Sequence, residues 1–111
     1  MFMSTNRFLK MNLSESSSNL VSKAIVDVNA QKTDDRLLLD HPDTRLLGED
    51  GVVDSLAFAY LVVCIEQYAL DDLNKEIVLF DDEVMQMDFD SIDNPFMTIG
   101  SLTALVKRKL M

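Results

Sequence analysis

The sequence predicts an all-α protein, a small bundle of three main helices and one short helix around a single hydrophobic core. Apolar residues recur with helical spacing in three separate stretches, polar residues suited to capping precede these stretches, and no stretch shows the sustained alternation of a β-strand. The 111 residues suit one domain, and 48% hydrophobic with 26% charged residues is typical of globular proteins.

The first predicted helix runs from about Asn19 to Gln31. Its apolar residues fall at positions i, i+1, i+4, i+5 and i+8 and so line one face, with Ser18 or Asn19 as the cap. These apolar residues are Leu20, Val21, Ala24, Ile25 and Val28. Residues 1–18, which include a serine-rich run, are expected to form a partly ordered N-terminal arm, and residues 19–111 the folded domain.

A long loop is predicted from about Thr33 to Val53. It contains Pro42, two glycines and five leucines. Because these leucines would otherwise lie in water, we expect the loop to be ordered and to fold back over the core.

The second predicted helix follows Asp54 and extends to about Tyr68, or on to Leu73. It is apolar almost all round, since hydrophobic side chains fill the positions where a surface helix normally carries charge. These outward positions hold Ala57, Phe58, Tyr60 and Leu61. One side of this helix should therefore face the core and the other a partner.

The remaining elements are short, apart from a last helix. Ile77–Phe80 is a candidate extended piece, and Asp81 can cap a brief turn through Met85. Thr98 can cap the last helix, whose basic final turn, residues 107–109, suits the negative end of the helix dipole.

The net charge of −9 argues against nucleic acid as a partner and favours docking to basic patches on other proteins. A single cysteine, Cys64, permits no internal disulfide and no four-ligand zinc site, so a reducing cytoplasm is the default location. No apolar run is long enough for a membrane span, and no export signal is visible. We expect a monomer.

The candidate functional residue is Ser55. Two glycines at 48 and 51 form a turn before it, Asp54 can cap the helix, and Ser55 falls in the first helical turn with its hydroxyl predicted to point outward. A phosphate ester there would lie against unpaired backbone N–H groups at the positive end of the helix dipole. The position therefore suits a serine modified through phosphate.

With these motifs the chain resembles the stand-alone acyl carrier proteins, over about Leu20 to Leu110. The resemblance rests on the glycine-rich approach, on Asp54-Ser55-Leu56, and on Glu66 near the end of the same helix. A second match is residues 94–102, Asn-Pro-Phe-Met-Thr-Ile-Gly-Ser-Leu, which is similar to the start of the last helix in many carriers.

The resemblance implies a division of labour in which the chain itself is not an enzyme. Ser55 would carry a covalent 4′-phosphopantetheine cofactor, Asp54 would help the phosphopantetheinyl transferase by contacting its metal ion, and Leu56 would contact partners. Acyl groups would be held as thioesters on this arm. Partner enzymes of fatty acid, polyketide or related specialised biosynthesis would load and remove them.

The chain departs from this family along the helix after the serine. Carriers of fatty acid synthesis usually place acidic residues there, where this chain has Ala57, Phe58, Tyr60 and Leu61. We predict an apolar partner surface centred on Tyr60 and Leu61, with acidic residues at its edges. Those acidic residues are Glu49, Asp50, Asp71 and Asp72.

Two alternatives stay open: an aminoacyl or peptidyl carrier, and an unmodified adaptor with the carrier fold. Other reactive residues favour ordinary roles: Cys64 as a buried hydrophobe and His41 as a solvated turn residue. Residues 88–93 resemble a calcium loop, but Ile92 and Asp93 replace an oxygen ligand and the glycine such a loop needs. We therefore predict no metal site and no active site of the chain's own.

Overall fold

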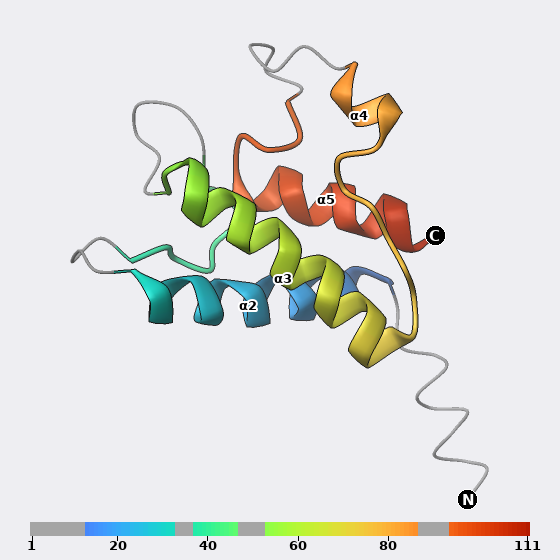
Figure 1. Ribbon diagram of the computed structural model, residues 1–111, viewed down its shortest axis with the longest axis horizontal. Coiled ribbons are helices and arrows are strands. Elements are labelled where there is room, and N and C mark those ends of the chain that lie inside the picture. Colours follow the sequence, from blue (N-terminus) through green and yellow to red (C-terminus); the bar gives the residue numbers. More distant parts are fainter. Residues whose placement is uncertain (1–12, 33–36, 47–52, 87–93) are drawn as a thin grey trace, which may run out of the picture.

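Helices make up most of the chain that the computed structural model describes, which is residues 13–32, 37–46, 53–86 and 94–111 (Figure 1). They are α2 (Leu13–Gln31), α3 (Ser55–Leu73), α4 (Asp82–Met85) and α5 (Ile99–Leu110). Within those ranges there is no strand, and one isolated bridge joins Arg45 to Thr98. The prediction of an all-α protein with three main helices and a short one is confirmed.

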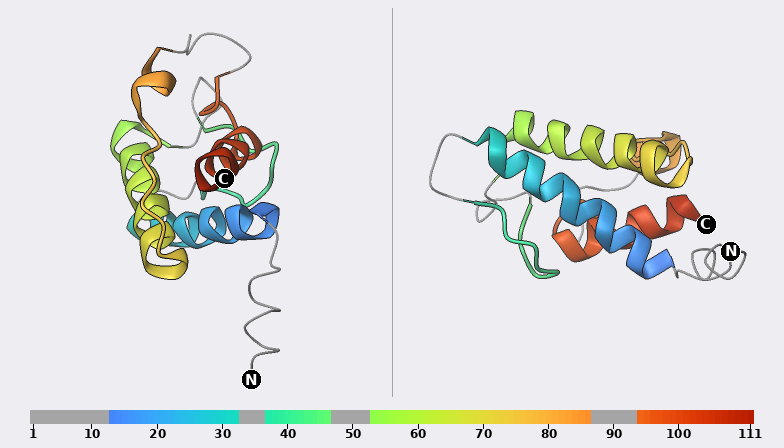
Figure 2. Two further views of the ribbon diagram at one scale, coloured as in Figure 1. Left: turned by 90° about the vertical axis from the view of Figure 1, so that its right-hand side faces the viewer. Right: turned by 90° about the horizontal axis from the view of Figure 1, so that it is seen from below.

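Helix α2 holds the bundle together because it contacts both α3 and α5 (Figure 2). The apolar face predicted for it is buried in full. Apolar residues of α3, of α5 and of the segments around α4 complete the same core. None of the helices in the described ranges combines the length and the apolar character needed to cross a lipid bilayer.

Helix α2 begins at Leu13, six residues before the predicted start at Asn19. Ser18 and Asn19 therefore lie inside the helix and do not cap it, so that part of the prediction was wrong. Ser17 is buried, and its hydroxyl donates a hydrogen bond of 2.7 Å to the carbonyl of Leu13, one turn earlier. Such bonds let serine occupy a helix interior, which its propensity alone does not favour.

The described part of the long loop, residues 37–46, folds back over the core as predicted. Leu38 and Leu46 are buried, whereas Leu37 and Leu39 are exposed. The side chain of Asn29 in α2 fixes Leu38 by donating to its carbonyl at 2.9 Å and accepting from its N–H at 2.8 Å. Leu47 lies outside the described residues.

After α3 the chain passes through residues 77–80. Buried and exposed side chains alternate there as in an extended segment, although the segment forms no strand. Ile77 and Leu79 are buried, and Val78 and Phe80 are exposed. The Leu79 N–H donates to the carboxylate of Glu66 in α3 at 2.9 Å. Glu66 therefore anchors this connection to the middle of α3.

The predicted caps of the last two helices are confirmed. Asp81 accepts a hydrogen bond of 2.9 Å from the Val84 N–H at the start of α4. Thr98 caps α5 in a reciprocal capping box with Ser101. The predicted basic last turn of α5 is also present.

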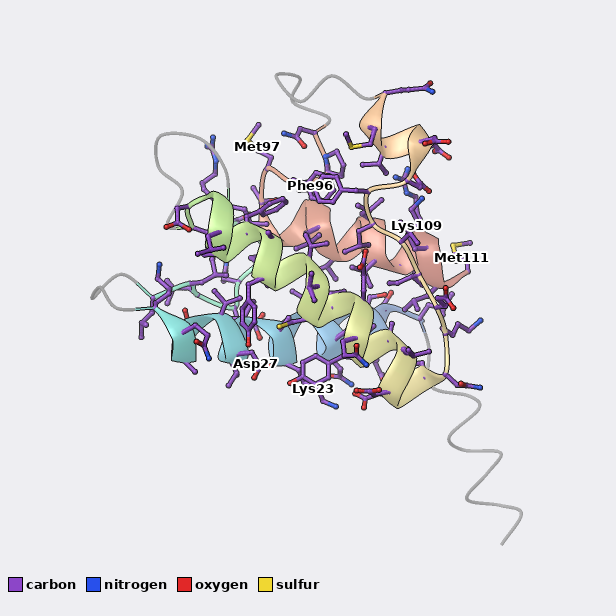
Figure 3. All side chains as sticks on the ribbon, viewed as in Figure 1. Lys23, Asp27, Phe96, Met97, Lys109 and Met111 are labelled. Atoms are coloured by element: carbon purple, nitrogen blue, oxygen red, sulfur yellow. The ribbon has the colours of Figure 1, made fainter. Side chains whose placement is uncertain are left out.

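The cap of α4 is also linked to the end of α5, because the Lys109 ammonium donates to the Asp81 carboxylate; Figure 3 shows Lys109 reaching from α5. This hydrogen bond lowers the pKa of Asp81 below its ordinary value of 3.8. A lowered pKa means that the interaction stabilises the fold above the unfolded-state pKa, and that this contribution is lost as the pH falls through the folded-state pKa.

We expect Lys109→Met to raise the pKa of Asp81 toward its ordinary value, because the first cause of the shift is removed. NMR titration of the Asp81 carboxyl carbon would measure it. Lys107→Met, at an exposed position in the same helix turn, is the matched control and should leave the titration in place. An unchanged Asp81 titration in Lys109→Met would contradict the assignment.

Candidate functional site

Helix α3 starts at Ser55, the residue that the sequence singles out, and Asp54 is its N-cap. The Asp54 backbone is extended, and its carboxylate accepts a hydrogen bond of 2.8 Å from the Ala57 N–H. The cap is formed as predicted. The orientation of the Ser55 hydroxyl and the glycine turn at 47–52 lie outside what the structure describes.

The capping role of Asp54 can be separated from the metal-contacting role that the resemblance implies. We expect Asp54→Ala to lower the free energy of unfolding by about 1 kcal/mol, whereas Asp54→Asn, which keeps a capping oxygen, should cost little. Thermal or urea unfolding measures both. If the carboxylate also meets a metal ion of a modifying transferase, Asp54→Asn should slow modification while it leaves stability nearly intact.

Loop residues 42–46 lie against the start of α5. The Leu46 N–H donates to the Met97 carbonyl at 2.8 Å, and the Ile99 N–H donates to the Thr44 carbonyl at 2.9 Å. The end of the described loop segment, residues 37–46, is thus held against the Phe-x-Thr segment.

Gly100 allows the closest of these approaches. Its N–H donates to the Pro42 carbonyl at 2.8 Å, and a β-carbon at position 100 would lie 2.9 Å from that oxygen. The neighbouring atom belongs to the backbone, so it cannot give way as a flexible side chain would. Glycine is needed here for space.

Three aromatic rings, one of them from α3, pack against one another next to the core. Phe58 meets Phe80 and Phe96 edge to face, with ring centroids 5.9 and 5.3 Å apart. Phe80 stacks on Phe96 at 4.6 Å. Figure 3 places Phe96 between α3 and the chain leading to α4.

The prediction that Ala57, Phe58, Tyr60 and Leu61 face outward was wrong for Leu61. That side chain is 0% exposed and belongs to the core. Ala57 and Phe58 are half-buried against the core, and Tyr60 is 39% exposed. Leu61 therefore cannot form the centre of a docking surface.

The apolar side chains that α3 does expose form a different stripe. Leu56 is 79% exposed and Val63 58%, with Tyr60 between them and Leu70 further along the same helix. Their spacing of three, four and seven residues places them on one face. The sequence interpretation missed Val63, because α3 is apolar almost all round and several of its faces show such spacing.

Of the acidic residues predicted to edge the partner surface, Asp71 and Asp72 lie exposed near the end of α3. Asp71 accepts from the Gln67 amide at 3.0 Å, and Asp72 pairs with Lys23 of α2. Glu49 and Asp50 lie outside the described residues. Asp72 is therefore partly neutralised, and Asp71 contributes more of the negative charge at this end.

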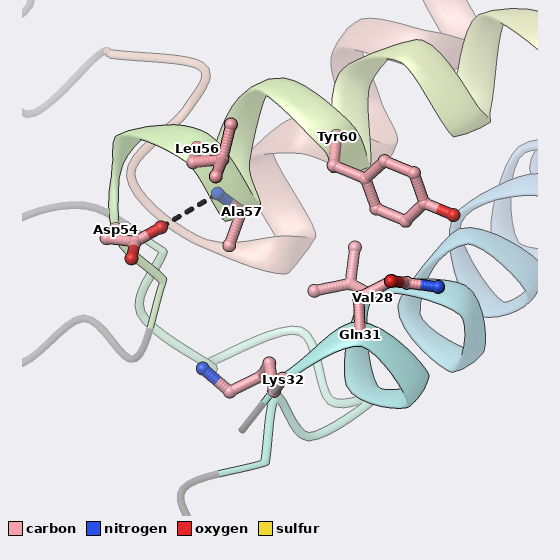
Figure 4. Close-up of a pocket in the computed structure, with 7 residues that line it drawn as sticks. All are labelled: Val28, Gln31, Lys32, Asp54, Leu56, Ala57 and Tyr60. Atoms are coloured by element: carbon pink, nitrogen blue, oxygen red, sulfur yellow. Dashed lines mark hydrogen bonds between the residues drawn. The ribbon is translucent and has the colours of Figure 1, made fainter. Parts of the chain in front are cut away.

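A groove of about 470 Å³ opens at the start of α3, between α3 and the end of α2 (Figure 4). Sequence reasoning did not predict it, because it depends on how the two helices cross. Asp54, Leu56, Ala57 and Tyr60 line it from the α3 side, and Val28, Gln31 and Lys32 from the α2 side. Its volume is in the range of small-molecule sites, about 300–1,000 Å³.

Other reactive side chains occupy the ordinary positions that the sequence suggested. Cys64 is buried, and burial raises the pKa of its thiol. His41 lies exposed in a turn, where its Nδ1 accepts a 3.1 Å hydrogen bond from the Asp43 N–H. The calcium-loop-like residues 88–93 lie outside the described residues.

Comparison with protein-family models, with curated proteins and with solved structures gives no match to this chain.

Proposed function

We propose that the chain is an acyl carrier protein whose Ser55 is esterified by 4′-phosphopantetheine. The arm holds acyl intermediates as thioesters and delivers them to enzymes of fatty acid, polyketide or related specialised biosynthesis. The carrier supplies no chemistry of its own. It acts by presenting a tethered thiol at high effective concentration to the enzymes that dock on it.

The observation that carries this proposal is the position of Ser55 as the first residue of a 19-residue helix, directly after a formed Asp54 cap. Several backbone N–H groups at such an end have no partner within the helix, and the helix dipole is positive there. A phosphodiester attached at this position is stabilised by both. Asp54-Ser55-Leu56 is also the single Asp-Ser-Leu triplet in the sequence.

The order of the elements also supports the proposal. Among the described residues, the long helix α2, a loop whose residues 37–46 pack on the core, a helix that starts at the candidate serine, a short helix and the helix α5 follow one another as the resemblance to acyl carriers implies. Backbone hydrogen bonds also hold loop residues 42–46 against residues 97–100, which belong to the second segment that carries the resemblance.

The test is mass spectrometry of the protein co-expressed with a phosphopantetheinyl transferase, with the adduct mapped by peptide sequencing. We expect one phosphopantetheine on Ser55. Loading assays with acyl and with amino-acid donors then separate an acyl carrier from an aminoacyl or peptidyl carrier. Absence of the adduct with several transferases of different specificity would contradict the carrier function.

Partner enzymes are proposed to dock on the exposed stripe of Leu56, Tyr60 and Val63. We expect Tyr60→Arg to slow acyl loading of the modified protein by a loading enzyme at least about tenfold, because an aromatic anchor is replaced by a charge that must be desolvated. Val26→Arg, on an exposed position of α2, is the matched control and should load normally. Equal loading of both variants would rule out docking through Tyr60.

The second candidate is an adaptor with this fold that binds partners without the arm. The same exposed stripe favours it, since an apolar face of this kind suits a protein interface with or without a modified serine. Such an adaptor would stay unmodified with every transferase and would still lose partner binding in Tyr60→Arg.

A further inference from the structure

The charge of the chain is divided unevenly between its first twelve residues and the rest. Residues 1–12, which precede the described part of the chain, contain two cations, Arg7 and Lys10, and no Asp or Glu; half of the twelve are apolar. Residues 13–111 contain eight Lys or Arg and 19 Asp or Glu, a net charge of −11. The folded part therefore attracts the basic segment, and a surface that also offers apolar contact would bind it best.

Such a surface lies next to the point where α2 begins. A groove of about 560 Å³ opens between the first half of α2 and the end of α3. Ser16, the first lining residue along the sequence, follows Leu13 by three residues, which is about 4.5 Å along the helix axis. The full lining is Ser16, Asn19, Leu20, Ser22, Lys23, Asp71, Asp72 and Leu73.

The lining combines apolar contact with negative charge. Leu20 is buried, and Leu73 is half-buried against the core. Lys23 pairs with Asp72, whereas the exposed Asp71 pairs with no cation among the described residues. The C-terminal end of α3 adds the negative end of its helix dipole. This end of α3 therefore suits a ligand that carries both positive charge and apolar side chains.

We propose that residues 1–12 bind in this groove of their own chain. Residues 7–10, Arg-Phe-Leu-Lys, place two apolar side chains between two cations. The cations can pair with Asp71 while the apolar side chains pack against Leu73. Twelve residues span at most about 40 Å, and the groove extends only about 10 Å along α2, so the segment has ample reach.

The groove at the start of α3 suits this segment less well. Its lining on α2 begins only at Val28, which lies about 22 Å along the helix axis from Leu13. It contains the cation Lys32, and its carboxylate, Asp54, already caps α3. A basic segment therefore gains more at the end of α3.

The chain's own segment is also favoured over the same segment of a second copy. Its connection to α2 starts beside the groove and keeps it there at an effective concentration on the order of millimolar. A second copy would in addition bring its own negative folded part close to this one.

Binding of this segment has a consequence for the docking of partners. It would cover Asp71, one of the acidic residues predicted to edge the partner surface. Where a partner docks on α3 as proposed above, the partner and the segment compete for the same carboxylate. The segment would then act as a built-in regulator of docking.

Amide NMR spectra of the full chain, without any covalent modification, test the proposal. The double variant Arg7→Gln/Lys10→Gln should shift the amide signals of residues 16–23 and 71–73, because the segment leaves the groove. Unchanged signals at these positions would overturn the proposal.

The matched control is Lys107→Gln/Arg108→Gln, which removes the same charge from two exposed positions at the end of α5. It should leave the signals of the groove residues in place. Equal shifts of those signals in both double variants would mean that they report net charge alone, and would also overturn the proposal.

Crosslinking with a carbodiimide, which joins an ammonium only to a carboxylate in contact with it, gives a second readout. We expect Lys10 to be linked to Asp71 of the same chain, and we expect this link to be lost in Asp71→Asn. A mixture of isotope-labelled and unlabelled chains separates links within one chain from links between two. Links between chains, or links from Lys10 spread evenly over the acidic residues, would overturn the proposal.

These outcomes are independent of the carrier function. A chain that stays unmodified with every transferase, yet shows the link from Lys10 to Asp71, would overturn the carrier function and leave the bound segment standing. A chain that is modified on Ser55 but lacks this link would do the reverse.

Discussion

Ser55→Ala should abolish phosphopantetheine attachment completely, because the variant has no hydroxyl to attack the phosphate of the donor. The expected result is a protein that keeps its unmodified mass under conditions that convert the parent fully. The fold should be unaffected, since alanine is the best helix former and Asp54 still caps α3. Intact-protein mass spectrometry measures the first effect and circular dichroism the second.

The matched control is Ser18→Ala, which removes an exposed hydroxyl from α2. It should be modified at the rate of the parent. Modification of Ser55→Ala at any other residue would show that the attachment point has been assigned wrongly, even if the chain is a carrier.

Phe96→Ala should give the largest loss of stability, about 3–5 kcal/mol in the free energy of unfolding. Phe96 is 1% exposed and contacts both other rings of the aromatic cluster. Its truncation therefore leaves a buried cavity, which would close only if Phe58 and Phe80 both moved. Domains of this size are stable by about 5–15 kcal/mol, so the variant loses a large share of that. Urea unfolding followed by circular dichroism measures the change.

Phe80→Ala is the control for this prediction. Phe80 belongs to the same cluster but is more than one third exposed, so less area returns to water and the remaining space opens to solvent. Its loss of stability should be clearly smaller. Equal losses for the two variants would mean that the cluster is not centred on Phe96.

Those parts of the fold that depend on local chemistry could be predicted from the sequence. Asp54, Asp81 and Thr98 were each recognised as helix caps because the cap and its N–H partner lie within three residues of each other. The last helix has a clear amphipathic period and a basic final turn, and it was predicted almost to the residue.

The faces of α3 could not be predicted from its sequence, because the helix carries apolar residues almost all round and its periodicity is weak. Leu61 and Val63 are both apolar residues of the same helix, yet Leu61 is buried and Val63 is exposed. What distinguishes them is the position of α2, of Phe80 and of Phe96, and these are tertiary contacts. The groove at Gln31 and Lys32 was missed for the same reason.

The chemical role of Ser55, unlike the helix start at which it lies, does not follow from the fold. The start of α3 was predicted correctly, but a helix start is common to modified and unmodified serines. The chemistry of Ser55 depends on a transferase that recognises the surface, and no contact within the chain reports such recognition. Only the covalent state of the expressed protein decides it.

The backbone pairing of residues 42–46 with the start of α5 has a further consequence for how the bundle fluctuates. The N–H groups of Leu46, Ile99 and Gly100 all donate hydrogen bonds across this one contact, in which Gly100 lies directly against the Pro42 backbone. The contact therefore protects all three N–H groups together. Opening any of them requires the first turn of α5 to separate from the loop. Residues 42–46 are thus expected to have a local unfolding free energy closer to that of a helix than to that of a surface loop.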